Sequence, residues 1–519
     1  MIVLLILIPI AAAIAIMAGA PARPAALGAA LLNLVLGAIF ALTFTGNPDD
    51  GGLTIQILEK PNIHLALGLY DGMSIILMLL TVIVTFAAVL SGRCPEGTER
   101  IWFPSTLFIA AGALGAFLST DLFFFYAFHE LALIPTFIMI GMLGRGDRKE
   151  AAWKITIYLA FGSIVLLAGL LWLVNAAGAD SLLFDDLLAS TIPADQQKGI
   201  AAFLLVGFGI LVSLFPFHSW AAPAYASAPA PVSMLHAGVL KKFGLYGLLR
   251  LYPMISEGLQ PWLTWLIVLL LGNILWVGFV TINQKRLDLM LGNSSVMHMG
   301  YVFLAIAALI AAGSESANPI AKPAAIVLMF AHGVSIALLF GLSDRIERKT
   351  GTLELRDLGG LAKSAPSLAF LFGLAGLASI GLPGLANFAG EVLVFLSGFK
   401  EFADDPAGGL GPIQVATILS LWGVVISAVY ILRAYRRTFQ GPVVTATDGA
   451  RDLTFAERIP AVFLAFFLIL PGLYPNTLIQ FMAHDAPSAE PPQIVHDADR
   501  PPLGIPRWSP GEGSMLTEH

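Results

Sequence analysis

Acidic and basic side chains occur inside apolar stretches along the whole of this sequence. Glu130 and Glu391 are the acids, and Lys241 and Lys242 are the amines. A charged side chain inside a bilayer is costly and is usually paired, so each such residue is a functional-site hypothesis by default. Groups that exchange protons in an apolar interior point to ion or proton transfer.

Histidines lie in or beside the same stretches, at His218, His236, His298 and His332. Histidine changes its protonation near neutral pH at modest cost, and such groups on successive helices are what a lateral proton relay needs. A single buried histidine is more often a satisfied core residue, but the whole set favours a relay. We predict relay residues and accessory groups as follows: Glu130, Lys242, Glu391, His298 and His332 form the relay, with Lys241, His236 and His218 accessory.

Glu130 lies near the middle of an apolar segment, 121–144, which is long enough to span a bilayer at about 1.5 Å per residue. Pro135 has no N–H, so the carbonyl of Leu131 loses its usual helix partner. A free carbonyl beside a buried acid would stabilise water or a cation. The alternative is a structural glutamate that a neighbouring helix satisfies.

Lys241 and Lys242 lie halfway along their apolar stretch, too deep to reach the membrane surface easily. Adjacent helical residues are about 100° apart, so the two lysines are expected to face different surroundings. No candidate metal ligands show helical i, i+3 or i, i+4 spacing, and the sequence has no phosphate-binding loop, dinucleotide motif or C-x-x-C. We therefore expect no metal site and no cofactor in this chain.

The composition is that of a polytopic membrane protein. Of 519 residues, 57% are hydrophobic and 12% are charged, whereas soluble domains carry about 25% charged residues. The single Cys94 excludes an internal disulfide, and the absence of a basic stripe argues against nucleic acid. The first twenty residues lack a charged leading region, so we expect a first helix instead of a removed signal.

We predict an all-α fold with about fourteen membrane spans. They lie near 1–20, 25–45, 71–91, 101–119, 122–144, 152–175, 197–216, 230–254, 260–281, 289–312, 320–342, 366–398, 412–434 and 458–482. Longer acidic loops are expected at 46–70 and 176–196. The inner loops of this arrangement hold most of the 28 lysines and arginines, so the positive-inside rule predicts that both termini lie outside.

Two predicted spans are interrupted, the seventh at 213–218 and the twelfth at 381–391. Broken helices at matching places in two halves indicate an inverted repeat of spans 4–8 and 9–13, although proline and glycine are also common in membrane helices generally.

The predicted parts are 1–100, a three-helix segment; 101–254 and 255–434, two five-helix bundles; 435–482, an inner loop and last helix; and 483–519, a Pro-rich polar tail that needs a partner to be ordered.

The segment HELALIPTF, residues 129–137, resembles the M-type antiporter-like subunit of respiratory complex I, the NADH-quinone oxidoreductase subunit M or chain 4 family. The resemblance covers essentially all predicted spans. Its further motifs are Asp71-Gly72-Met73-Ser74, Ser119-Thr120-Asp121-Leu122, Pro216-Phe217-His218-Ser219-Trp220, Leu240-Lys241-Lys242 to Tyr246-Gly247, Ser295-Val296-Met297-His298-Met299-Gly300, Ala331-His332-Gly333 and Leu382-Pro383-Gly384 to Gly390-Glu391. Single pieces also occur in the sister L- and N-type subunits and in Mrp-type cation/proton antiporters.

The resemblance implies a proton-pumping membrane-arm subunit of a translocase in the bacterial inner membrane. Glu130, Lys242 and Glu391 match the family's charged residues of the fifth, eighth and twelfth helices, while His298 and His332 match polar positions between them. The driving electron transfer from NADH to quinone takes place in other subunits, which carry the flavin, the iron–sulfur clusters and the quinone. L- and N-type subunits are the implied neighbours.

One departure from the family concerns the seventh helix. The family usually has a lysine where this chain has Leu211, so the expected ion-pair partner of Glu130 is missing. Three explanations stay open: Lys241 substitutes for it, Glu130 is protonated at rest because burial without a cation disfavours the carboxylate, or the chain belongs to a variant complex. His236 is a second departure, since this position looks more like the L-type and antiporter chains.

Two other functions remain as alternatives. The chain would be a subunit of an Mrp-type antiporter or a related ion-transport module that never meets NADH, or a structural membrane spacer whose relay has decayed. The missing lysine favours the spacer, whereas the retained Glu130, Lys242 and Glu391 argue against it.

Overall fold

The computed structural model describes residues 2–44, 52–404 and 409–482, and the predicted tail at 483–519 lies outside this part of the chain. The elements follow in this order: α1 Leu4–Met17, α2 Ala22–Thr43, β1 Leu53–Glu59, β2 Asn62–Leu67, α3 Gly72–Ser91, α4 Glu99–Leu118, α5 Leu122–Leu143, α6 Arg148–Ala177, α7 Phe184–Ala189, α8 Ala194–Val212, α9 Ala221–Ser227, α10 Ala230–Leu235, η1 His236–Leu240, α11 Lys242–Leu259, η2 Gln260–Trp262, α12 Leu263–Leu271, η3 Gly272–Val277, α13 Gly278–Ile282, α14 Leu287–Ala312, α15 Ala321–Thr350, η4 Leu361–Lys363, α16 Pro366–Ile380, α17 Ala386–Asp404, α18 Pro412–Phe439, α19 Phe455–Leu473 and α20 Asn476–Met482.

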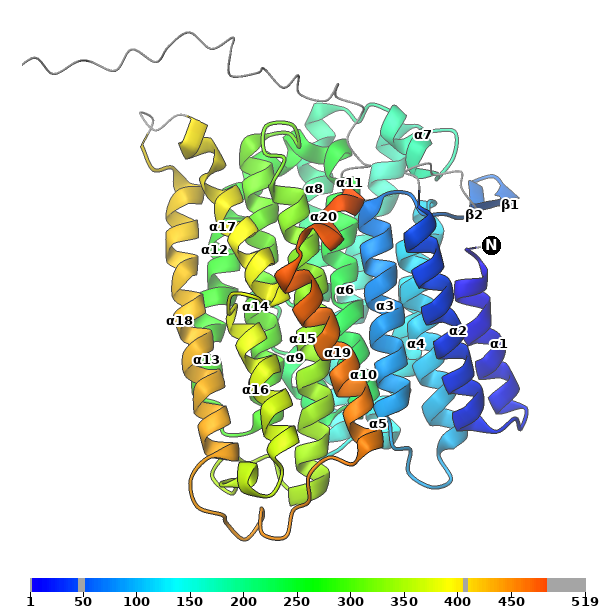
Figure 1. Cartoon of the computed structure of the whole chain (residues 1–519). Coiled ribbons are helices and arrows are strands. Elements are labelled where there is room, and N and C mark those ends of the chain that lie inside the picture. Colours follow the sequence, from blue (N-terminus) through cyan, green and yellow to red (C-terminus); the bar gives the residue numbers. More distant parts are fainter. Residues whose placement is uncertain (1, 45–51, 405–408, 483–519) are drawn as a thin grey trace, which may run out of the picture. The chain divides into compact units, whose positions relative to one another are not determined.

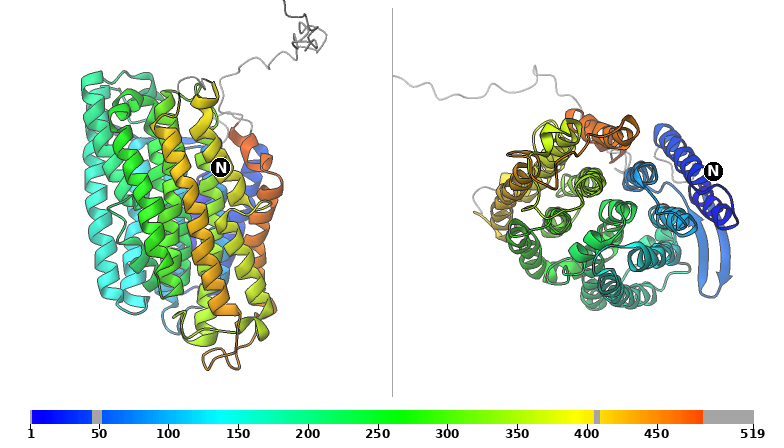
Figure 2. Two further views of the ribbon diagram at one scale, coloured as in Figure 1. Left: turned by 90° about the vertical axis from the view of Figure 1, so that its left-hand side faces the viewer. Right: turned by 90° about the horizontal axis from the view of Figure 1, so that it is seen from below.

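The predicted all-α membrane fold is confirmed. In the described part of the chain, 11 helical stretches are long and apolar enough to cross a membrane, and one of these, Ala230–Ile282, contains both the eighth and the ninth predicted span. Two shorter apolar helices, Leu4–Met17 and Pro366–Ile380, add to them. The helices run side by side in Figure 1, and Figure 2 shows them end on.

In the described part of the expected loop 46–70, an antiparallel hairpin of β1 and β2 takes the place of a simple loop. Its first strand reads LTIQILE, in which β-branched and apolar residues favour an extended chain. The hairpin continues into the bundle through a bridge between Leu67 and Ser119. The second expected loop, 176–196, likewise contains the short helix α7.

Both predicted helix interruptions are present. α8 ends at Val212, and Ser213 takes a left-handed conformation with φ 68°. Asn273 holds this break, because its Oδ1 accepts from the N–H of Phe215 at 2.5 Å and its Nδ2 donates to the carbonyl of Ser213 at 3.3 Å. α16 ends at the left-handed Gly381, and α17 begins five residues later at Ala386.

The eighth span contains a feature that the sequence did not reveal. Residues His236–Leu240 form a π-helical turn between α10 and α11, immediately before the two lysines. Single π turns inside helices occur frequently at functional sites. α5, in contrast, runs without a break through Pro135.

The helices α14 and α15 occupy the middle of the packing. α15 packs against α3, α10, α14, α16, α17 and α19, and α14 packs against α9, α17 and α18. Almost every residue of both helices is buried. The two predicted relay histidines of these helices are therefore enclosed by protein.

The predicted inner loops meet at one end of the bundle. Glu457, on α19, lies 3.2 Å from Arg93 in the α3–α4 loop, and it lies 3.7 Å from Arg345 and 3.6 Å from Lys349, which are both on α15. Arg145 and Glu347 form a further ion pair between the α5–α6 loop and α15. These ion pairs involve four of the basic residues on which the positive-inside prediction depends: Arg93, Arg145, Arg345 and Lys349.

Candidate functional site

Glu130 projects from α5 and is held by two polar side chains. The hydroxyl of Ser163, on α6, donates to Glu130 Oε1 at 2.6 Å. The Nδ1 atom of His129 lies 3.4 Å from the same oxygen. The Glu130 side chain remains 36% exposed on the outside of the bundle, so its environment in this chain alone is incomplete for a group at membrane depth.

His129 connects this carboxylate with the lysine-bearing helix. Its ring is 3% exposed and stacks on Phe243, with 3.9 Å between the ring centroids and an interplanar angle of 17°. Phe243 directly follows Lys242 in α11. The imidazole is therefore placed between the acid of α5 and the bases of the eighth span.

The two lysines face different partners, as their angular separation predicts. The ammonium of Lys242 donates to the carbonyl of Ala237, inside the π turn, at 2.6 Å. The ammonium of Lys241 donates to Ser295 Oγ on α14 at 3.3 Å and lies 5.1 Å from the centroid of the Tyr225 ring. Both lysines are essentially inaccessible to solvent. The accessory candidate Lys241, and not Lys242, makes the hydrogen bond that leads into the second half.

A polar series continues from this contact. Ser295 Oγ lies 3.2 Å from His332 Nε2, and the His332 ring stacks on that of His298 with centroids 5.3 Å apart. The two ring nitrogens of His298 each lie 2.8 Å from a carbonyl oxygen, that of Ser294 and that of Ser379. Both ring nitrogens therefore have an acceptor within hydrogen-bond distance.

Glu391 lies at the second helix break. Its carboxylate rests against Gly381, where a Cβ would overlap Oε2, and the residue is 4% exposed. The Tyr301 ring is 5.9 Å from the His298 ring and 5.7 Å from that of Phe395 on α17, so Tyr301 connects the surroundings of His298 with the helix that carries Glu391.

The remaining predicted residues surround the lysines. His236 Nδ1 lies 3.4 Å from the hydroxyl of Tyr225, and His218 stacks on Phe215 with 5.4 Å between centroids. In the described part of the chain, His236 Nε2, His218 Nδ1 and His332 Nδ1 are buried without a hydrogen-bond partner. Unsatisfied buried nitrogens of this kind are where internal water would bind.

Leu211 stands where the family resemblance leads one to expect a lysine. It is 4% exposed and approaches Gly162, at which a Cβ would be 3.3 Å from Leu211 Cδ2. Gly162 precedes Ser163, the hydrogen-bond donor to Glu130. Leu211 therefore packs against the part of α6 that carries Ser163, and Lys241 has its partner on α14.

Sequence reasoning missed an ion pair at the other end of the eighth span. Arg250 donates to both carboxylate oxygens of Asp71, at 2.8 and 2.9 Å, and also to the hydroxyl of Tyr246 at 2.9 Å. Arg250 and Asp71 are 4% and 9% exposed in their side chains. The sequence does contain the signal for this pair. Arg250 lies within an apolar span, and Asp71 stands at the start of another.

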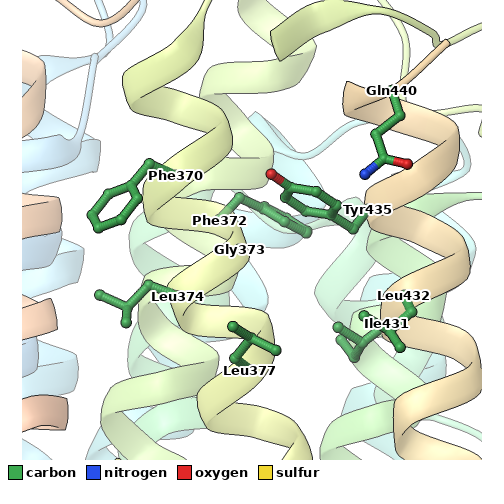
Figure 3. Close-up of a pocket in the computed structure, with 9 residues that line it drawn as sticks. All are labelled: Phe370, Phe372, Gly373, Leu374, Leu377, Ile431, Leu432, Tyr435 and Gln440. Atoms are coloured by element: carbon green, nitrogen blue, oxygen red, sulfur yellow. The ribbon is translucent and has the colours of Figure 1, made fainter.

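A cavity of about 390 Å³ lies apart from these groups, between α16 and α18. Figure 3 shows its apolar lining, with Tyr435 and Gln440 as the polar residues. None of the predicted relay residues borders it. Within the described ranges, no group of three His, Cys, Asp or Glu side chains is arranged to hold a metal ion.

Comparisons with known proteins agree on one family. The profile described as "NADH:quinone oxidoreductase/Mrp antiporter, TM" matches residues 119–403. "NAD(P)H-quinone oxidoreductase chain 4 1" of Synechococcus sp. (strain JA-3-3Ab) is 33% identical over 92% of this chain and 90% of its own. "NADH-quinone oxidoreductase subunit M" of Rickettsia felis is 31% identical over 81% of this chain and 82% of its own.

Solved structures give the same result. A chain of respiratory complex I from Thermus thermophilus with bound NADH superposes with a TM-score of 0.83 and 28% identity, covering 93% of this chain and 99% of that one. A chain of the Mrp complex from Dietzia sp. DQ12-45-1b gives a TM-score of 0.77 at 19% identity, covering 93% and 96%. The second likeness concerns the fold alone.

Proposed function

Because the chain belongs to the family of NADH-quinone oxidoreductase and Mrp antiporter membrane subunits, with chain 4 and subunit M relatives over most of its length, we propose that it translocates protons in the membrane arm of an NADH-quinone oxidoreductase. The electron transfer that drives it takes place in other subunits, which hold the flavin, the iron–sulfur clusters and the quinone. This chain supplies the proton path.

The observation that carries this proposal is the connected series Lys241–Ser295–His332, followed by the stacked His298. It crosses from the eighth to the eleventh predicted span inside the protein. A decayed spacer would have no reason to keep these buried groups in mutual contact, since each buried polar group costs free energy unless it is satisfied.

The proposed transfer starts at Glu130, which takes a proton from the inner side. The proton moves to the lysine pair, and the ammonium of Lys241 gives a proton to Ser295 Oγ while the serine hydroxyl gives its own to His332 Nε2. The serine is unchanged at the end of this step, and the lysine has become a neutral amine. Lys242, with its ammonium on the Ala237 carbonyl, supplies the second positive charge that favours this release.

The second half leads to the outer side. Water at the unpartnered Nδ1 of His332 would connect it with His298, and Glu391 would receive the proton beside Tyr301. In this proposal the five-helix bundles 101–254 and 255–434 are inverted repeats, and both chain termini face outward. The basic residues that form ion pairs at one end of the bundle support that orientation.

Sister subunits of the L and N type are the proposed neighbours. Glu130 is 36% exposed, and the flanking faces of α5 and α6 expose large apolar side chains such as Ile134 and Ile157. A carboxylate open to lipid is costly, so a neighbouring protein surface is its proposed cover.

The test is proton pumping by the purified complex in proteoliposomes, measured per NADH oxidised. Glu130→Gln and Glu391→Gln should each lower the pumped proton number while the complex stays assembled. An unchanged number in either assembled variant would contradict the proposal. Sodium-dependent transport without NADH would instead favour the antiporter function, which the description of the matched family profile also includes.

A further inference from the structure

The carboxylate of Glu130 is not left without a partner by the absence of the seventh-helix lysine. Leu211 packs against α6 at Gly162, and two side chains contact Glu130 Oε1. These are Ser163 at 2.6 Å and His129 at 3.4 Å. Of the two, only His129 is a base.

His129 is built into the core. It is 3% exposed, and its ring lies flat on Phe243 at 3.9 Å between centroids. The stacking on Phe243 holds the plane of the ring, and the Nδ1 edge is directed at the glutamate. A histidine that only filled space in the core would not need to direct a ring nitrogen at a carboxylate.

The position of Ser163 is fixed independently. The hydroxyl of Tyr126 donates to the backbone carbonyl of Ser163 at 3.2 Å, which joins α5 to α6 one turn before Glu130. Gly162 allows close packing, because a Cβ there would meet Ile210 and Leu211 of α8. The serine hydroxyl is thereby held against Glu130 from the helix that faces it.

We infer that His129 is the proton-exchanging base of Glu130 in this chain, taking the place of the cation that the seventh helix lacks, and that Ser163 positions the carboxylate for it. This inference rests on the proposed proton translocation. A proton on Glu130 Oε1 moves to Nδ1 of the neutral imidazole, leaving a carboxylate beside an imidazolium. No other reactant is needed, and the charge pair has the same signs as a glutamate–lysine pair.

The arrangement also gives the proton a direction. Through its stacking on Phe243, His129 adjoins the helix of Lys242. Positive charge on His129 is therefore felt by the bases of the eighth span, whose deprotonation it would favour. Protonation of Glu130 and proton release from the lysines are therefore linked through the ring of His129.

The experiment compares three variants of the whole complex. His129→Phe keeps an aromatic ring on Phe243 and removes only the base. His129→Phe with Leu211→Lys puts a cation back from α8, and Ser163→Ala removes the positioning hydroxyl. Pumped protons per NADH are measured in proteoliposomes, with His64→Phe as control for the same change on the hairpin strand β2.

We expect His129→Phe to slow proton transfer through this subunit by about 10²-fold, the typical contribution of a positioned acid–base group. The added Leu211→Lys should restore pumping, a recovery that a purely structural role of His129 would not produce. Ser163→Ala should reduce pumping less, and His64→Phe should leave it unchanged. If His129→Phe prevents assembly, His129→Gln with and without Leu211→Lys takes its place.

Normal pumping by His129→Phe, with pumping lost in Glu130→Gln, would overturn this inference and leave the proposed function intact. Failure of Leu211→Lys to restore an assembled His129→Phe complex would also overturn it. Normal pumping in Glu130→Gln itself would instead contradict the proposed function.

Discussion

Lys241 donates a hydrogen bond to Ser295, with 3.3 Å between Nζ and Oγ, across the boundary between the two predicted five-helix bundles. The neighbouring Lys242, which matches the family's lysine, bonds to its own helix at Ala237 instead. The π turn that precedes both lysines sets these directions, since it offsets the helix by part of a turn. The two lysines therefore have separate tasks in the proposed relay.

Replacement of Ser295 tests the bridge between the bundles. Ser295→Ala removes the only side-chain oxygen that contacts both Lys241 and His332 in the described structure. We expect pumping through this chain to slow by about 10²-fold, the scale of a lost acid–base group, with assembly unchanged. Ser343→Ala, which removes a buried hydroxyl bonded to the Phe340 carbonyl on the same helix as His332, is the control. Equal pumping in both variants would contradict a role for Ser295.

The close approach of Gly381 to Glu391 gives a second prediction. Gly381 has φ 83°, and a Cβ at this residue would occupy the position of Glu391 Oε2. Gly381→Ala should cost roughly 1–2 kcal/mol of backbone strain and displace the carboxylate from the helix break. Pumped protons per NADH should fall, whereas Gly351→Ala, also at positive φ but in open space, should leave pumping unchanged. Full pumping by Gly381→Ala would show that the place of Glu391 is not critical.

The membrane spans and their interruptions could be predicted from the sequence, because they follow from the length and composition of its apolar segments. The helix breaks at Ser213 and Gly381 were predictable because proline and glycine end helices. The π turn was not predictable, since its residues have ordinary helical propensities and only the surrounding packing selects it. The contacts of His129, Ser163 and Ser295 depend on helix rotation and packing distance, which spacing along the chain does not determine.

The buried pair of Asp71 and Arg250 provides a prediction about stability. Arg250→Met leaves the carboxylate of Asp71 unpaired and should destabilise the protein by about 3–5 kcal/mol, as for other broken buried pairs. The double change Asp71→Asn with Arg250→Met removes both charges and should recover a large part of this loss. Thermal unfolding of the purified complex in detergent measures both. Additive losses in the double variant would mean that the two residues contribute independently.

The loop before α19 provides a pH-dependent test outside the membrane. Burial alone would raise the pKa of Asp452, but hydrogen bonds from Ser367, Leu453 and Leu368 outweigh it and hold the pKa below its ordinary value. Two of these donors are the first free N–H groups of α16, so the carboxylate caps that helix.

A lowered carboxyl pKa adds stability that is complete above the unfolded value of about 3.9 and is lost as the pH falls through the folded value. Hydrogen exchange at Ser367 and Leu368 should therefore accelerate as the pH falls below about 4, after correction for intrinsic exchange rates. Asp452→Asn should exchange faster at pH 7 and should lose this dependence. The same corrected pH profile in both proteins would exclude the cap as its cause.

The central claim is that protons cross this chain through its buried lysines. The most direct measurement is the number of protons pumped per NADH by proteoliposomes that contain the complex. The variants are Lys241→Met, Lys242→Met and the double change. Lys198→Met is the control, because its ammonium lies near the Trp262 ring, away from the relay. We expect each relay variant to pump fewer protons per NADH and Lys198→Met to pump the normal number. The double variant should lose no more protons than this chain alone contributes. Unchanged pumping by an assembled double variant would contradict the central claim.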